Sequence, residues 1–273
     1  MVLDFPWYLR QARDTRTKKK LKYYENVAKR LDSQKKLVEL KGKQNFPLML
    51  GSFKFWLNDN NVLGSLDTYG EIFKEKHHTK LKNFSGKGDN IIIDLGANEG
   101  YYILKIKENS PNSKIIAVEP NPEAFRILQK NVRANMLKNV VLFKNVISEK
   151  TGRVGFEIVK GVTQIGGVKI YGKREWLERN RVRKIEAKSI TLEKLMKLNK
   201  IKKVDLLKID TEGNEMKILR SSKKILKCVD KIVIEYHGKK LRRHVKNFFE
   251  KNGFKMLLGE RVDCGDIYFK KMR

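Results

Sequence analysis

The stretch I-I-I-D-L-G-A-N-E-G-Y-Y-I-L at residues 91–104 decides the fold. Three isoleucines lead into Asp94, and Gly96 and Gly100 bracket a short polar segment before an apolar run resumes. A short apolar run predicts a buried strand, and a glycine-bracketed polar segment predicts a tight turn. The stretch therefore predicts a strand that ends in a turn and opens a helix, which is how many α/β proteins hold nucleotides.

Strand and helix patterns alternate from residue 90 onward. The predicted strands are 91–96, 114–119, 140–145, 204–210 and 231–237, and the predicted helices are 100–108, 121–135, 191–199, 213–226 and 239–252. This alternation predicts an α/β fold with a mostly parallel sheet covered by helices on both faces. Two closely spaced strands follow at 254–259 and 266–271, so one of them is expected to run antiparallel at the sheet edge.

The chain of 273 residues divides into a basic helical extension at 1–45 and a main domain at 46–273. The extension has Leu21 and Tyr24 at helical spacing. Within the main domain, we expect a cofactor half (90–150), a basic insertion (150–190) and a substrate-side half (191–273).

Two further elements are predicted before residue 90. Residues 52–59 alternate as a strand does, and residues 65–78 predict a short helix with Asp67 as its cap. Toward the C-terminus, the apolar side chains of helix 239–252 share one face, which should pack on the sheet. They are Leu241, Val245, Phe248 and Phe249.

The net charge of +30 lies mainly in the flanks, and the region around the turn is nearly neutral. Basic flanks suit an anionic partner such as nucleic acid or a lipid surface, but a lysine-rich composition alone would also produce them. The sequence has no apolar run of 18 residues, and its start lacks the apolar core of a signal peptide. Cys228 and Cys264 have no metal-ligand spacing and are expected as buried thiols. These features predict a cytoplasmic protein with no transmembrane segment.

The ligand of the turn follows from its charges. An NAD site requires G-x-G-x-x-G with a pyrophosphate at the helix start, whereas D-L-G-A-N-E-G has two glycines and the carboxylates of Asp94 and Glu99. These carboxylates would repel a pyrophosphate but favour S-adenosylmethionine, which carries a sulfonium and an ammonium and no phosphate. Glu119 ends the next strand, where an acid can accept hydrogen bonds from both ribose hydroxyls. The pattern therefore predicts S-adenosylmethionine as the cofactor.

Three stretches resemble the FkbM-type S-adenosylmethionine-dependent methyltransferases: IIIDLGANEGYYIL, AVEPNPEAFRILQKNV and DLLKIDTEGNEMKIL. The resemblance covers roughly residues 50–240, and K-I-D-x-E-G-x-E is its most specific part. It implies a class I methyltransferase fold, which is Rossmann-like with a seven-stranded mostly parallel sheet. It also implies methylation of a hydroxyl oxygen on a small molecule or a sugar.

The same resemblance implies the cofactor-binding residues. Those around the methionine part would be Asp94, Gly96, Asn98 and Gly100, to which the charge argument adds Glu99. Glu119 would hold the ribose with Asn121 close to it, and Asn145 and Val146 would flank the adenine.

Candidate catalytic residues follow the fourth and fifth strands. Transfer to an alcohol requires a group that takes the hydroxyl proton, and Asp210, Glu212 and His237 are the candidates. The alternatives are that Asp210 or Glu212 caps the next helix and that His237 is a polar strand-end residue. Lys208 is expected either at the site or as the buried partner of an acid. Glu215 is interpreted as structural.

No metal site is predicted. Asp210, Glu212 and Glu235 could offer oxygen ligands, but acids at strand ends are common without a metal. His77 and His78 fall in a loop and receive no role.

The stretch YGKREWLERNRVRK at 171–184 has two interpretations. It could be a lid or an anion-binding helix in which Trp176 stacks on a base or sugar, or a solvated helix pinned by Trp176.

The predicted function is therefore O-methylation of a small molecule or sugar. The alternative is an RNA- or protein-modifying methyltransferase that docks through its basic flanks. Adenine-N6 chemistry is disfavoured, because the fourth strand ends in K-I-D-T rather than in N-P-P-Y or D-P-P-Y. A third hypothesis is a nucleic-acid-binding module on a degenerate methyltransferase fold, against which the intact turn argues.

Overall fold

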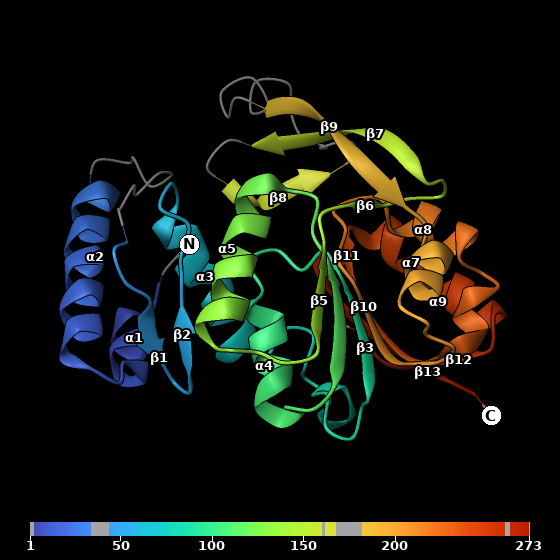
Figure 1. Cartoon of the computed structure of the whole chain (residues 1–273), viewed down its shortest axis with the longest axis horizontal. Coiled ribbons are helices and arrows are strands. Elements are labelled where there is room, and N and C mark those ends of the chain that lie inside the picture. The colour runs from blue at the N-terminus through green and yellow to red at the C-terminus, as the bar shows by residue number, and fades with distance from the viewer. Residues whose placement is uncertain (1–2, 34–43, 160–161, 168–181, 260–262, 273) are drawn as a thin grey trace.

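The computed structural model describes residues 3–33, 44–159, 162–167, 182–259 and 263–272. Its centre is a sheet of seven strands (Figure 1). They are β3 (Ile91–Leu95), β4 (Lys114–Val118), β5 (Val140–Phe143), β10 (Val204–Ile209), β11 (Val229–His237), β12 (Phe254–Gly259) and β13 (Cys264–Lys271). The predicted α/β architecture is confirmed.

The strand order is β12-β13-β11-β10-β3-β4-β5, and neighbours from β11 to β5 are parallel. The antiparallel strand is β13, which lies between β11 and β12 rather than at the edge. The expectation of an antiparallel edge strand was therefore wrong. The reason lies in the side chains, since Ile267, Tyr268 and Phe269 are all fully buried, whereas burial along β12 alternates as an edge strand allows.

Helices cover both faces of the sheet, because successive strand residues point to opposite sides. On β3, Ile92 faces a core built with α3 (Val62–Phe73), α4 (Tyr101–Asn109) and α5 (Pro122–Ala134). Ile93 and Leu95 face a second core built with α7 (Leu192–Leu198), α8 (Glu215–Ser221) and α9 (Lys239–Lys251). Short 3₁₀ turns lie at η1 (Lys82–Phe84) and η2 (Ile225–Cys228). Val245 and Phe249 of α9 are buried, which confirms its predicted apolar face.

The N-terminal extension contains α1 (Phe5–Gln11) and α2 (Thr15–Ser33), and its residues 34–43 lie outside the described structure. These helices pack on a hairpin of β1 (Leu48–Leu50) and β2 (Phe53–Phe55). Leu21 and Tyr24 are fully buried in the same core as α3, and Tyr8 Oη donates to Leu66 O at 2.7 Å. The extension therefore continues the main core.

The cap of α3 differs from the prediction. Asn61 caps the helix and accepts from Gly64 N, whereas Asp67 lies inside it. In N-D-N-N-V the chain offers several cap residues in a row, and the helix starts earlier than its apolar pattern suggested.

The insertion at 150–190 contributes to a second, small sheet that lies above one end of the central sheet in Figure 1. Its order is β6-β9-β7-β8, made of β6 (Val146–Ile147), β7 (Gly152–Val159), β8 (Val162–Gly167) and β9 (Val182–Ile190). In the basic stretch 171–184, residues 182–184 belong to β9, and Trp176 lies outside the described residues.

The two cysteines are more exposed than the sequence predicted. Cys228 is half-buried and Cys264 is exposed, so the expectation of two buried thiols was wrong. Among the described residues, no helix combines the length and the apolar character that a bilayer crossing requires.

Candidate cofactor and acceptor site

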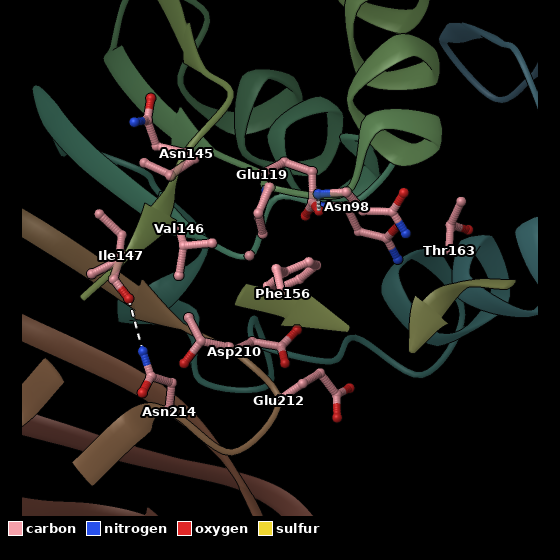
Figure 2. A pocket seen from close by; sticks show the side chains of 15 residues that line it. Asn98, Glu119, Asn145, Val146, Ile147, Phe156, Thr163, Asp210, Glu212 and Asn214 are labelled. Carbon is pink, nitrogen blue, oxygen red and sulfur yellow. Dashed lines mark hydrogen bonds between the residues drawn. The ribbon is translucent and has the colours of Figure 1, made fainter. Parts of the chain in front are cut away.

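A pocket opens at the carboxyl ends of β3, β4 and β10, beneath the small sheet (Figure 2). Its lining consists of Gly96, Asn98, Val118, Glu119, Pro120, Asn121, Asn145, Val146, Ile147, Phe156, Thr163, Asp210, Thr211, Glu212 and Asn214. In open α/β sheets, ligands bind at this edge. The pocket therefore lies where the sequence placed the cofactor.

The turn after β3 is held by both neighbouring strands. The amides of Gly96 and Ala97 donate to Val118 O at the end of β4, at 2.9 and 3.0 Å. On the other side, Gly96 packs so closely on the end of β10 that a Cβ added to it would lie 1.7 Å from Asp210 O. Only a glycine fits here, and the turn is thereby fixed in position.

Glu119 is fixed in the pocket wall by two backbone amides. Its Oε2 accepts from Asn98 N at 2.8 Å and its Oε1 from Asn121 N at 2.7 Å. Burial raises the pKa of Glu119 to about 7, although both amide hydrogen bonds oppose the rise. Asn98 Oδ1 is also buried at the pocket and has no hydrogen-bonding partner among the described residues. An orphaned acceptor beside a fixed carboxyl group fits a ligand that brings an ammonium and a ribose diol.

A pH dependence of cofactor affinity follows from Glu119. The ionised carboxylate can accept hydrogen bonds from a diol, and a pKa near 7 leaves it mostly ionised at pH 8 and mostly protonated at pH 6. We therefore expect about tenfold weaker S-adenosylmethionine binding at pH 6 than at pH 8 in calorimetric titrations. Glu119→Gln should bind S-adenosylmethionine weakly at both pH values, because its side chain does not ionise. Equal wild-type affinity at the two pH values would contradict this role.

Asp94 lies behind the pocket wall rather than in its lining. Its carboxylate is fully buried, and Lys208 Nζ lies 3.3 Å from its Oδ1. Lys208 also donates to Gly96 O at 2.6 Å and lies 3.2 Å from Asp210 Oδ2, which confirms the interpretation of Lys208 as the partner of neighbouring acids. We infer that Asp94 affects the cofactor through the turn that it supports.

Glu99 and Gly100 also lie outside the pocket lining. The two oxygens of Glu99 accept from Thr163 Oγ1 at 2.6 Å and from Tyr101 Oη at 2.7 Å. Gly100 is the N-cap residue of α4 and packs against Leu128 of α5. The charge argument for Glu99 did not foresee these hydroxyl partners, and we infer that Glu99 ties the turn to the small sheet.

The rest of the pocket lining mixes apolar and amide side chains. Three residues that the sequence assigned to the cofactor line this part of the pocket: Asn121, Asn145 and Val146. Asn121 also caps α5. The sequence missed Phe156 on β7 and Thr163 on β8, which reach the pocket from the small sheet (Figure 2). R-V-G-F-E-I-V has a strand pattern, but the pattern does not say onto which surface the strand folds.

The three predicted catalytic residues lie together at the carboxyl ends of β10 and β11. Asp210 and Glu212 line the pocket, and His237 Nε2 lies 3.7 Å from Glu212 Oε2. Burial, Asp210 and Glu215 raise the pKa of Glu212 to about 8. Burial would also raise the pKa of Asp210, but Lys208 and its other partners outweigh it and lower that pKa to about 2.

Neither Asp210 nor Glu212 caps α8. The loop is held instead by Glu215, whose Oε1 accepts from Thr211 N at 3.2 Å and from Gly213 N at 2.9 Å. Glu215 is therefore structural, as interpreted from the sequence. Both other acids remain available to a ligand.

His78, which received no role from the sequence, is a further residue beside the site. Its Nδ1 lies 2.7 Å from Asp266 Oδ1, and its backbone amide donates to Asp266 Oδ2 at 2.6 Å. Its Nε2 lies 3.9 Å from Asp210 Oδ2. A loop histidine is thus fixed beside the predicted catalytic acids.

The structure combines a seven-stranded sheet that contains a reversed β13 with a pocket between the turn after β3 and Glu119. These features define a class I S-adenosylmethionine-dependent methyltransferase. The sequence profile of the methyltransferase FkbM domain matches residues 94–256. The chain belongs to the FkbM methyltransferase family, as its resemblance indicated, and S-adenosylmethionine is its cofactor.

Three relatives share 24% identity with the chain. Methyltransferase 1 of Beauveria bassiana matches over 64% of this chain and 76% of its own length. The hexuronic acid methyltransferase AglP of Haloferax volcanii matches over 55% and 57%, respectively. The 2-O-methyltransferase NoeI of Sinorhizobium fredii matches over 61% and 71%.

Proposed function

We propose that the protein transfers a methyl group from S-adenosylmethionine to a hydroxyl oxygen of a small molecule or sugar. The observation that carries the proposal is the group of Asp210, Glu212 and His237 at one end of the cofactor pocket. Such groups can orient a hydroxyl and take its proton. The names of two relatives, a hexuronic acid methyltransferase and a 2-O-methyltransferase, support a sugar acceptor.

The proposed reaction is an in-line displacement. The cofactor supplies a methyl group already activated by its sulfonium. Bound S-adenosylmethionine would supply the methyl group to the acceptor oxygen and would keep the electron pair of the broken carbon–sulfur bond, while Asp210, Glu212 or His237 would take the hydroxyl proton. We assign the cofactor's ribose to Glu119 and its methionine end to the turn at Gly96 and Asn98. Alignment and exclusion of water supply most of the remaining rate acceleration.

Local charge disfavours a nucleic acid, which presents a row of phosphate groups, as the acceptor. The acceptor end of the pocket carries Asp210 and Glu212, with Glu235 close behind. Phosphate groups would meet the carboxylate of Asp210 here and no basic side chain among the residues that line the pocket, even though the whole chain has a net charge of +30. The basic flanks could still dock RNA or a protein elsewhere, which is the alternative that salt dependence tests.

The first experiment is calorimetric titration of S-adenosylmethionine, and separately of NAD, into protein freed of nucleic acid. We expect the first ligand alone to bind. Glu119→Ala should lose binding, because charge-assisted hydrogen bonds to the ribose disappear, and Glu123→Ala at the start of α5 should keep it. Binding of NAD, or wild-type affinity in Glu119→Ala, would refute the site.

The acceptor is then sought by transfer of a radiolabelled methyl group to hexuronic acids, glycans, RNA and protein. We expect labelled sugar ethers, formed at a rate that changes little between about 50 and 200 mM salt. Over this range nucleic-acid binding typically weakens by orders of magnitude. Label in RNA alone, at a rate that falls steeply with salt, would replace the sugar proposal with the alternative.

A further inference from the structure

Three potential metal ligands converge beside the pocket from separate parts of the chain. They are His78 in the loop after α3, Asp210 after β10 and Glu235 on β11, and one ligand atom of each lies within 4.8 Å of the other two. Nitrogen and oxygen ligands about 2.0–2.2 Å from one ion can be up to about 4.4 Å apart, so small side-chain movements would complete such a site.

The orientation of His78 is that of a metal ligand. Asp266 accepts from both the ring and the backbone of His78, at 2.7 and 2.6 Å, and Tyr268 Oη donates to the same carboxylate at 3.0 Å. With its proton held at Nδ1, a neutral His78 directs the lone pair of Nε2 toward Asp210. Histidines that bind metals are typically fixed by a carboxylate in this way.

The side chain of His78 is only 6% exposed. Its Nε2 lies 3.9 Å from Asp210 Oδ2, which is beyond hydrogen-bonding distance. A nitrogen that faces two carboxylates from beyond hydrogen-bonding distance suits a ligand that lies between them.

The local charge also calls for a cation. Four carboxylates lie together here, those of Asp94, Asp210, Glu235 and Asp266, and Lys208 is the cation that contacts two of them. Asp210 and Glu235 are half-buried and share this space, so a bound cation would compensate their carboxylates where they are ionised. Buried charges require such compensation.

We propose that His78, Asp210 and Glu235 bind one first-row divalent metal ion, through an imidazole nitrogen and two carboxylate oxygens. This ligand set suits manganese or zinc. The inference rests on the proposed function in one respect: since Asp210 lines the pocket, the ion would lie where it can bind the acceptor's hydroxyl oxygen and make it more acidic. The sequence did not predict this site, because its histidine is distant along the chain.

A neighbouring group shares Glu235 with His237 and Cys264. Both of these side chains are exposed, and Cys264 Sγ lies 3.6 Å from Glu235 Oε1. His237 Nε2 lies 3.7 Å from Glu212 Oε2, beyond hydrogen-bonding distance, whereas Asp266 holds His78 Nδ1 at 2.7 Å, so the His78 group is the better-organised site.

The test is metal binding to the full chain, which does not require a known acceptor. Metal-stripped protein is titrated with Mn²⁺, free Mn²⁺ being followed by electron paramagnetic resonance, and is dialysed in parallel against Zn²⁺ with elemental analysis. We expect one ion per chain. His78→Ala and Glu235→Gln should weaken binding at least tenfold, and Asp266→Asn about tenfold, since it only positions His78.

The matched control is His244→Ala, because His244 is an exposed histidine on α9 and should not affect binding. Circular dichroism and S-adenosylmethionine titration of each variant separate loss of the ion from loss of the fold or of the cofactor site. Absence of one-to-one binding with both metals, or wild-type affinity in folded His78→Ala, would overturn the ion site and leave the proposed function standing. If the wild type does not bind S-adenosylmethionine, the proposed function is refuted and the ion site still stands.

Discussion

Gly96→Ala is expected to abolish S-adenosylmethionine binding and to destabilise the fold by several kcal/mol. The added Cβ would lie 1.7 Å from Asp210 O, a backbone atom that cannot rotate away, so the turn after β3 and the end of β10 must separate. The residue also has φ +83°, which costs an L-residue about 1–2 kcal/mol. Denaturant unfolding measures the stability, and calorimetry measures cofactor affinity.

Gly88→Ala separates the two causes. Gly88 has nearly the same backbone angle, φ +81°, but an added Cβ would meet no atom within 4 Å. This variant should lose only the conformational contribution, about 1–2 kcal/mol, and should keep wild-type cofactor affinity. If both variants lose the same stability and both still bind the cofactor, the close contact between the turn and β10 does not matter.

The central sheet could be predicted because its signals are local. Apolar strands, a glycine turn and helix caps occur within a few residues of one another, and Glu119 ends the strand that follows the turn. Once β3 and β4 are parallel neighbours, Glu119 and the turn must meet at one edge. That is why the pocket formed where the spacing predicted it.

The small sheet and the order of the last strands depend on distant partners. Within the insertion, β9 pairs with β7. β9 also pairs with β6, which precedes the insertion in the chain. Strand propensity predicts such pairings poorly, because it mainly reflects the environment of each side chain. Phe156 and Thr163 were missed for this reason.

His78 shows the same limit at the level of one side chain. Its partner Asp266 lies 188 positions away, on the strand whose place in the sheet was also mispredicted. No local pattern distinguishes His78 from His77, which precedes it in the same loop. Only the fold brings the loop after α3 against the ends of β10, β11 and β13.

Lys208→Met is the second change with a large expected effect. Lys208 is 3% exposed and lies 3.3 Å from Asp94 and 3.2 Å from Asp210. Without the ammonium, Asp94 is left as a fully buried carboxylate with no opposite charge, and the Gly96 carbonyl loses its donor. Removing one partner of a buried ion pair typically costs about 3–5 kcal/mol. We expect a loss of this size in denaturant unfolding, together with weaker cofactor binding.

Lys203→Met is the matched control. Lys203 lies just before the same strand and pairs with Asp230 at 2.6 Å, which is closer than either pair of Lys208, but its side chain is 64% exposed. Water solvates both of its charges when the pair is broken, so no measurable change in stability or cofactor affinity is expected. If the two variants are equally destabilised, burial is not what gives Lys208 its importance. If Lys208→Met is as stable as the wild type, Asp94 must have found its proton or counter-ion elsewhere, and the lysine does not hold the turn in place.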